Sequence, residues 1–198
     1  MRLTINPTKT FKTLLDRTAI ETNPILRRNM ETLLKHQRCE LESRDFDLEG
    51  VMSTLITVPC YHMYCASQAN GDPVADATIE GADAVRAMYD YHFQSETFSL
   101  VEFDITHLVV DVFCIAASGI FKMGHRGTEL RKLGYEVDDP NAFYLYFAQH
   151  AEFYPFDKNG LMIGEDIYLP AIGFRGIEKR KIMRDPSGIG GFVDISDS

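Results

Sequence analysis

The chain has 198 residues and a mass of 22.5 kDa, of which 45% are hydrophobic residues, and this suits one domain with a full core. A formal charge of −9 argues against a nucleic-acid binder, because phosphate contacts need clustered lysine and arginine. No apolar stretch approaches bilayer length and residues 1–13 lack the apolar segment of a secretory signal, so we expect a cytoplasmic protein without a membrane partner.

The cysteines favour reduced thiols over a disulfide framework, because their spacing is irregular and contains no CxxC pair. They are Cys39, Cys60, Cys65 and Cys114. His36 lies three residues before Cys39, and His62 lies between Cys60 and Cys65, but structural zinc sites usually show tighter paired spacings. The sequence therefore predicts neither a metal site nor another cofactor.

The first half of the chain is predicted to be mainly helical, after an N-terminal extension over residues 1–23. Asn23 and Pro24 are typical of an N-cap followed by a proline in the first turn, and apolar residues then recur at helical spacing to Leu41. The expected elements that follow are a shorter helix from Asp45 to Leu55, an extended run at 60–65, a loop at 66–80 and a helix after Gly81.

From Phe98 onward, β-branched and aromatic residues predict a sheet. The expected elements are a hairpin of 100–110 and 112–121, an excursion at 122–141 with a helical turn at 128–133, two strands at 142–156 and 161–169, and an irregular tail at 171–198. The Asn-Gly pair between the last two strands is a strong tight-turn signal. Helices first and strands afterwards indicate an α+β domain over residues 24–170, whose bent sheet encloses one pocket.

Four phrases, DFDLEGVMSTL, IEGADAVRAMYDYHF, ITHLVVDVFCIAASG and FYPFDKNGLMIGEDIY, occur in an order that resembles the nuclear transport factor 2-like superfamily, nearest its SnoaL-like polyketide cyclase branch. The resemblance covers residues 24–170. It implies a conical α+β barrel with N-terminal helices packed into a strongly curved, mostly antiparallel sheet, and a homodimer formed through the outer sheet face. The superfamily contains both enzymes and binding modules, so the fold implies a pocket without fixing the chemistry.

The resemblance to ketosteroid isomerases puts a late-strand acid on Glu152. Because strand side chains alternate, His150, Glu152 and Tyr154 are expected to share the inner face. A two-residue turn at 158–159 would pair Glu152 directly with Glu165. Two opposed carboxylates need a shared proton, a cation or water, so one pKa should rise, and the pair with His150 forms a predicted acid/base device. The alternative is a slipped register, or two acids at a wet rim.

Further pocket residues are expected from the superfamily resemblance and from strand alternation: Tyr89, Tyr154, His107, Gln37, His62 and Met63. The isomerase base would fall near Met63, where the sequence has no carboxylate, and the isomerase tyrosine aligns with Gln37. For Tyr89 and Gln37 the alternative is plain core packing. For the two histidines it is an outward face, because their register is uncertain by one residue.

These patterns predict a cofactor-free lyase, isomerase or cyclase that moves protons on a small, apolar, carbonyl-bearing compound. Two other interpretations stay open at this point. The pocket could hold a hydrophobic ligand without turnover, or the domain could be a dimeric structural or interaction module.

Overall fold

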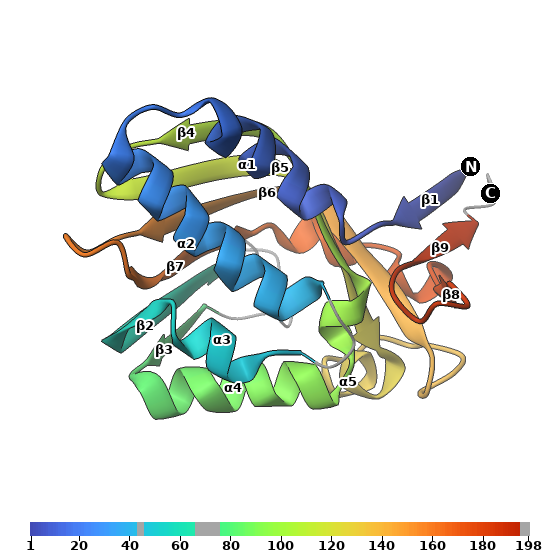
Figure 1. Cartoon of the computed structure of the whole chain (residues 1–198). Helices are drawn as coiled ribbons and strands as arrows, with labels where there is room; N and C mark the ends of the chain where they lie inside the picture. Colours follow the sequence, from blue (N-terminus) through green and yellow to red (C-terminus); the bar gives the residue numbers. More distant parts are fainter. Residues whose placement is uncertain (43–45, 66–75, 195–198) are drawn as a thin grey trace.

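The computed structural model describes residues 1–42, 46–65 and 76–194 (Figure 1). The helices are α1 (Lys9–Ile20), α2 (Pro24–Leu41), α3 (Leu48–Met52), α4 (Ala82–Gln94) and α5 (Gly127–Lys132), with 3-10 helices at Thr97–Leu100, Ala171–Phe174 and Ile177–Lys179. The strands are β1 (Arg2–Ile5), β2 (Leu55–Cys65), β3 (Ala77–Glu80), β4 (Val101–Val110), β5 (Cys114–Arg126), β6 (Phe143–Pro155), β7 (Met162–Leu169), β8 (Met183–Arg184) and β9 (Gly191–Asp194). The predicted α+β class is confirmed. Over the described residues, the helices are too short or too polar to cross a membrane.

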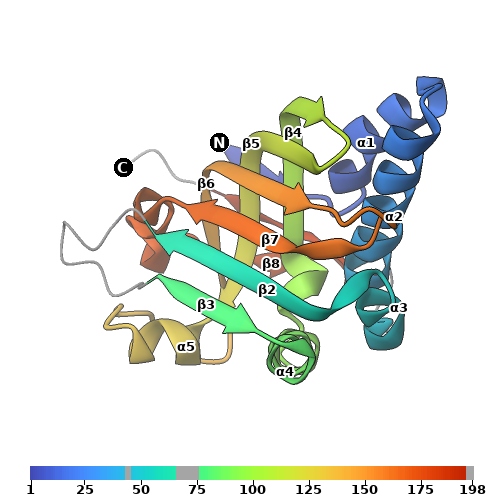
Figure 2. The ribbon, with the colours of Figure 1, turned by 90° about the vertical axis from the view of Figure 1, so that its left-hand side faces the viewer.

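A curved sheet with the order β3-β2-β7-β6-β5-β4 forms the body of the domain (Figure 2). All neighbouring strands run antiparallel except β2 and β7, which are parallel. Because the order is linear, the described strands form an open cone and not a closed barrel. Helix α4 contacts β2 and β3 at one end of the sheet and the 3-10 helix before β4 at the other, so a helix spans the gap between the edges.

Helix α2 begins where the sequence predicts. Asn23 Oδ1 accepts a hydrogen bond from the Ile25 N–H at 2.9 Å, and Pro24 occupies the first turn, where a missing N–H breaks no helical bond. The apolar residues that this helix buries are Met30, Leu33, Leu34 and Leu41. Burying this stripe against the sheet fixes the rotation of the helix and turns its polar residues 36, 37 and 40 toward the domain interior.

The region between α2 and α4 is partly as predicted. Asp47 caps α3 by accepting the Gly50 N–H at 2.8 Å, as expected, but the helix ends at Met52 and Leu55 begins β2. The loop expected at 66–80 is wrong at its C-terminal end, because β3 pairs there with β2 as an edge strand. Residues 66–75 and the expected helix start at Asp45 lie outside the described residues.

Strand β5 is longer than predicted and continues beyond Phe121 to Arg126. The excursion expected from residue 122 is therefore wrong at its start, because residues 122–126 pair with residues 143–147 of β6. Gly124 has no side chain to collide with Leu100, which packs directly over it. Gly124 is thus a close-approach site within a strand. The expected helical turn at 128–133 is confirmed as α5.

The turn between β6 and β7 contains one more residue than the two-residue hairpin that was predicted. Gly160 adopts φ +82°, the Asp157 N–H donates to the Leu161 carbonyl at 2.9 Å, and Phe156 bridges to Met162. A second irregularity follows at Gly164, where φ is +153° and a Cβ would collide with the Cys60 carbonyl. Each irregularity shifts the strand pairing by one residue.

Glu152 consequently pairs with Ile167, and the predicted pairing of Glu152 with Glu165 is wrong. The two single-residue shifts add up to an even number, and an even shift keeps side chains on the same face of a sheet. Glu165 therefore stays on the inner face as a diagonal neighbour of Glu152. The two carboxyl groups line the same cavity although they are not directly opposed.

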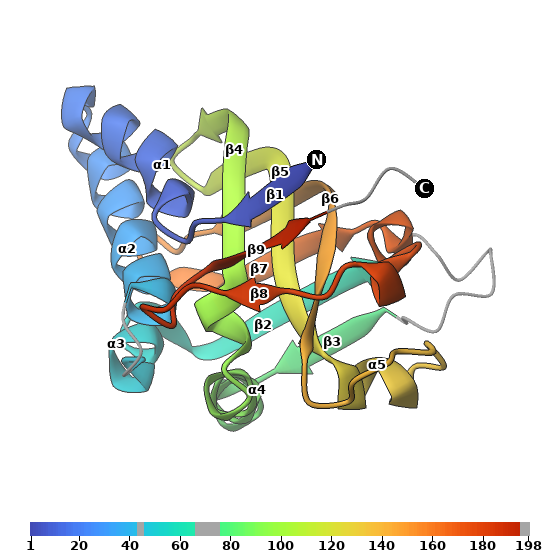
Figure 3. The same ribbon diagram turned by 90° about the vertical axis from the view of Figure 1, so that its right-hand side faces the viewer.

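The two ends of the chain pair in a second sheet with the order β1-β9-β8 (Figure 3). Arg2 pairs with Asp194 across this sheet, and its guanidinium lies 2.7 Å from that carboxylate. The tail at 171–198, which was expected to be irregular, therefore contains two strands and two 3-10 helices within its described residues, 171–194. Its strand β9 pairs with β1 at the other end of the chain, and local sequence patterns do not reveal such a pairing. Ile5 of β1 and Val193 of β9 belong to one buried apolar cluster with Leu145 of β6.

Candidate active site

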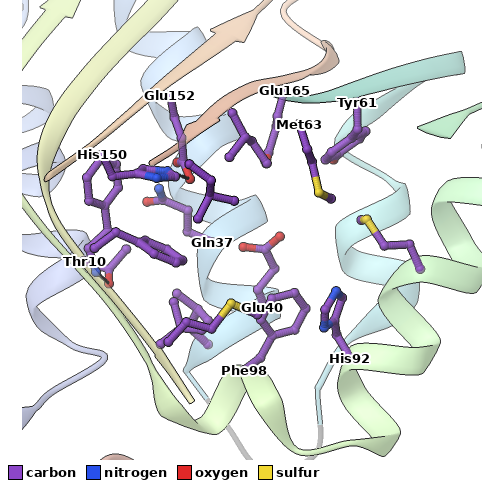
Figure 4. A pocket seen from close by; sticks show the side chains of 18 of the residues that line it. Thr10, Gln37, Glu40, Tyr61, Met63, His92, Phe98, His150, Glu152 and Glu165 are labelled. Carbon is purple, nitrogen blue, oxygen red and sulfur yellow. Dashed lines mark hydrogen bonds and ion pairs between the residues drawn. The ribbon is translucent and has the colours of Figure 1, made fainter. Parts of the chain in front are cut away.

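A cavity of about 260 Å³ lies between the inner face of the sheet and helices α2 and α4 (Figure 4). Its wall is mainly apolar and aromatic. The polar side chains that line it are Thr10, Gln37, Glu40, Tyr61, Tyr89, His92, His125, His150, Glu152, Tyr154 and Glu165. Thr10 comes from α1, so the N-terminal segment contributes to the cavity wall.

His36, Glu40 and Glu165 form an acid–base cluster at the cavity wall. Helix α2 presents His36 and Glu40 one turn apart, and the His36 Nε2 lies 3.1 Å from Glu40 Oε1 and 3.4 Å from Glu165 Oε1. The His36 Nδ1 lies 2.6 Å from Thr54 Oγ1, which donates its own proton to the Val51 carbonyl at 2.6 Å. The Thr54 oxygen therefore accepts the Nδ1–H, and both ring nitrogens of His36 face acceptors.

Burial and the charges of this cluster raise the pKa values of His36 and Glu165. Burial lowers the pKa of His36, but the charge of Glu40 and hydrogen bonds with Glu165 and Glu40 outweigh it and raise the pKa to about 10. Burial also raises the pKa of Glu165 to about 7, with the His36 hydrogen bond opposing the rise and Glu40 and Glu152 adding to it. His36 is therefore an imidazolium at neutral pH, and Glu165 gains and loses its proton there.

Two tyrosines extend the cluster. The Tyr89 hydroxyl lies 2.9 Å from His36 Nε2 and 3.1 Å from the Tyr61 hydroxyl. Both rings are fully buried, and burial raises the pKa of each phenol well above its ordinary value. The two hydroxyls are consequently protonated at neutral pH and can donate hydrogen bonds.

Glu152 is held by its neighbours on β6. The His150 Nε2 lies 2.6 Å from one Glu152 oxygen, and the Tyr154 hydroxyl donates to the other. The His150 ring stacks on Phe121 at 4.5 Å and meets the edge of Phe103 at 5.2 Å. With both oxygens engaged, Glu152 is a positioned carboxylate with a fixed place on the wall.

His36, Glu40 and Glu165 have the side-chain types and the spacing of metal ligands, because each offers a ligand atom within 4.8 Å of the others. A metal needs a lone pair on the imidazole nitrogen. Here the His36 Nε2 faces two carboxyl groups, whose charge favours a proton at that position. We therefore interpret the cluster as a hydrogen-bonded acid network, and the absence of a metal stays a prediction.

No protein-family profile and no curated protein matches the sequence. Solved structures do match. A protein from Jannaschia sp. CCS1 described as a SnoaL-like polyketide cyclase has a TM-score of 0.55 at 13% identity, over 80% of this chain and 96% of that one. A protein from Shewanella denitrificans OS-217 with the same description has a TM-score of 0.53 at 11% identity, over 75% of this chain and 95% of that one. The chain has the SnoaL-like fold. This confirms the resemblance seen in the sequence, and at such identities it concerns the fold alone.

A third solved structure with this fold contains a ligand. It is RV0760c from Mycobacterium tuberculosis in complex with estradiol-17β-hemisuccinate, with a TM-score of 0.50 at 16% identity, over 72% of this chain and 93% of that one. A protein with this fold is thus known in complex with a steroid derivative.

Within this SnoaL-like fold, most of the predicted site residues lie together. His150, Glu152, Glu165, Tyr89, Tyr154, Gln37 and Met63 all line the cavity. Their roles stay predictions, since a position on the wall does not by itself establish a function.

His62 and His107 lie elsewhere. Tyr61 and Met63 point inward, so His62 between them faces outward, where its Nδ1 lies 2.7 Å from Asp166 Oδ1. His107 is exposed beside an irregularity in the β4–β5 pairing and lies 3.0 Å from the Thr106 hydroxyl. A pocket role for either histidine is therefore wrong, because in both cases the strand face was undetermined by sequence.

Sequence reasoning did not place His36, Glu40 or Tyr61 in the site. The signal for two of them was present, since His36 and Glu40 are four apart on the same helix as Leu33 and Gln37, which were expected inside. A buried histidine one turn from a glutamate is a candidate ion pair. Their meeting with Glu165 depends on the packing of α2 on β7, which no local pattern predicts.

Proposed function

We propose that this protein is a proton-transfer enzyme, of the lyase, isomerase or cyclase type, that acts without a cofactor on a small, apolar, carbonyl-bearing compound. The observation that carries this proposal is the position of Glu165 on the wall of an apolar cavity that Glu152 also lines. Burial there raises the pKa of Glu165 to about 7. A base whose pKa matches the working pH combines a high deprotonated fraction with a high proton affinity.

The residues of the cavity supply the steps of such a reaction. Glu165 removes a proton from the carbon next to the carbonyl, the C–H electron pair forms a C=C bond, and the carbonyl oxygen takes the negative charge. Tyr61 and Tyr89 are protonated donors on the same wall and would hydrogen-bond that oxygen. The proton on Glu165 then returns to another carbon or to solvent. His36 and Glu40 act as positioning residues for Glu165.

We expect the enolisation rate to rise with pH through about 7. The base is active when deprotonated, so kcat/KM should increase as pH rises through the pKa of Glu165 and level off above it. The measurement follows the exchange of the α-protons of 2-tetralone for deuterium in D2O by NMR, between pH 5 and 9. A rate that does not exceed the buffer-catalysed rate, or a profile flat across this range, would contradict the proposal.

A binding module is the second candidate, and the apolar wall favours it. RV0760c, which shares the fold, holds a steroid derivative, and the cavity described here also has aromatic walls. A binding module would retain 2-tetralone without exchanging its protons. Measuring affinity alongside the exchange rate separates the two functions.

We also propose a homodimer through the exposed part of the outer sheet face. Tyr64, Phe153 and Tyr168 are 39%, 39% and 45% exposed there, and Tyr168 stacks on Tyr64 at 4.7 Å and contacts the edge of Phe153 at 5.7 Å. Three adjoining aromatic side chains on one face are typical of an interface. A second copy of the chain would cover them.

The Tyr168→Lys variant is expected to be monomeric, because a charge in the centre of this face cannot be buried without a partner. Light scattering should give 22.5 kDa for the variant and twice that mass for the wild type. Phe113→Lys is the matched control, since Phe113 is 72% exposed in the β4–β5 turn, away from this face. A monomeric wild type would contradict the proposed dimer.

A reducing, cytoplasmic compartment fits the free thiols of Cys39, Cys60 and Cys114. We infer that these thiols stay reduced during function. Thiol labelling of unfolded protein purified without reductant should modify all three, and disulfides among them would contradict this.

A further inference from the structure

The cavity has an excess of hydrogen-bond acceptors and negative charge. Glu40, Glu152 and Glu165 line it, and none of the described residues on its wall is a lysine or an arginine. The imidazolium of His36 lies against this wall, and Glu40, Glu152 and Glu165 contribute three carboxyl groups to the same region. A ligand that brings a positive charge and N–H donors would therefore complement the wall better than an anion.

Three buried polar atoms on this wall have no partner within the described chain: Gln37 Oε1, His92 Nδ1 and His150 Nδ1. Gln37 and His150 lie at one end of the cavity and His92 at the other (Figure 4), and the side chains of Gln37 and His150 are only 4% and 2% exposed. Figure 4 shows the Gln37 amide entering the pocket toward His150 and Glu152. The His150 Nε2 faces the Glu152 carboxylate, so in the neutral ring the proton lies on Nε2 and Nδ1 carries a lone pair. Leaving buried acceptors unpaired is unfavourable, which indicates that a ligand supplies the donors.

Aromatic rings flank these acceptors. Phe121 stacks on His150, and Phe103 contacts both rings edge-on, at 5.2 Å to His150 and 6.0 Å to Phe121. Both phenylalanines line the cavity. Phenyl faces attract an organic cation and also pack against an apolar body. Charge, orphaned acceptors and aromatic surface thus meet at one end of the cavity.

We propose that the substrate carries a primary amine, whose ammonium group donates hydrogen bonds to Gln37 Oε1 and His150 Nδ1. This rests on the proposed function only in that the cavity binds a small organic molecule. It specifies the substrate class as an apolar amino ketone. The amine binds at Gln37 and His150, and the carbonyl faces Glu165, Tyr61 and Tyr89. Gln37 is then a specificity-determining residue.

Four probes of matched shape test this assignment: 2-phenylethylamine, 2-phenylethanol, ethylbenzene and 3-phenylpropionate. We expect calorimetric titration of the wild type to give at least tenfold tighter binding for the amine than for the alcohol and the hydrocarbon, and the weakest binding for the anion. Raised salt should weaken the binding of the amine and leave that of ethylbenzene unchanged.

The Gln37→Leu variant should lose about tenfold in affinity for the amine and keep its affinity for ethylbenzene within twofold. Since Gln37 Oε1 has no protein partner, this substitution removes no described hydrogen bond from that oxygen. Gln94→Leu, at an exposed position of α4, is the matched control and should bind all four probes as the wild type does.

The outcomes separate the two proposals. Tighter binding of the alcohol than of the amine would identify a hydroxyl site and overturn the amine assignment. Equal binding of all four probes, or an unchanged amine affinity in Gln37→Leu, would also overturn it. Wild-type titrations decide the matter even if that variant does not fold. Amine preference without 2-tetralone exchange would overturn the proton-transfer function alone. Exchange without amine preference would overturn the amine assignment alone.

Discussion

The Glu165→Gln variant is expected to exchange the α-protons of 2-tetralone about 10²–10⁴-fold more slowly than the wild type. Glutamine has the shape of glutamate and fills the same place against His36, but it cannot take up a proton. The apolar wall is unchanged, so 2-tetralone affinity should stay within a few fold. The same NMR assay at pH 8 measures the rate, and calorimetry measures the affinity.

A matched control is Glu31→Gln on the solvent face of α2, where Glu31 is exposed. This variant should exchange 2-tetralone at the wild-type rate. If Glu165→Gln keeps the wild-type rate, Glu165 is not the base, and the same test on Glu152→Gln follows. If Glu165→Gln loses affinity and rate equally, the side chain positions the ligand and transfers no proton.

Lys122→Met is expected to lower the free energy of unfolding by about 3 kcal/mol. The Lys122 Nζ lies 2.7 Å from Glu102 Oε1 and 2.7 Å from the Thr4 carbonyl, and the other Glu102 oxygen accepts the Asn6 N–H at 2.5 Å. Because Glu102 is fully buried, removing the ammonium leaves a carboxylate without its closest counter-charge. The Lys9 Nζ lies 3.7 Å from Glu102 Oε1 and offsets part of the lost attraction. The expected cost is therefore at the lower end of the range for breaking a buried ion pair.

Urea unfolding of Lys122→Met, of Glu102→Leu/Lys122→Met and of the control Lys12→Met checks this prediction. The double variant removes both charges and should recover part of the lost stability. Lys12→Met should unfold close to the wild type, because Lys12 pairs with Asp16 on an exposed face of α1. A single variant as stable as the wild type would show that the buried pair contributes nothing. The pair also holds β1 and the start of α1 against the main sheet, which keeps Thr10 at the cavity.

The elements were predictable where their signal is local. Asn23 and Pro24 mark the start of α2 because capping depends on residues a few positions apart. The alternation of β6 placed His150, Glu152 and Tyr154 on one face for the same reason. The order of such elements was enough to indicate the SnoaL-like fold, which the solved structures confirm.

Features that depend on contacts between distant segments were not predictable. The pairing of Glu152 with Ile167 results from a turn at Gly160 and an irregularity at Gly164, where β7 meets β2 too closely for a side chain. The outward faces of His62 and His107 depend on strand register in the same way. The second sheet joins residues 2 and 194, and neither terminal segment shows an obvious strand partner nearby.

Sequence by itself thus determined the α+β class, the main helices and strands, and which residues of β6 face inward, because hydrophobic periodicity and caps act over a few residues. Only the tertiary structure decided that His36 and Glu40 of α2 meet Glu165 of β7, from the far end of the chain. The proton affinity of Glu165 follows from that meeting, since burial and the surrounding charges are properties of packed elements and of no single segment.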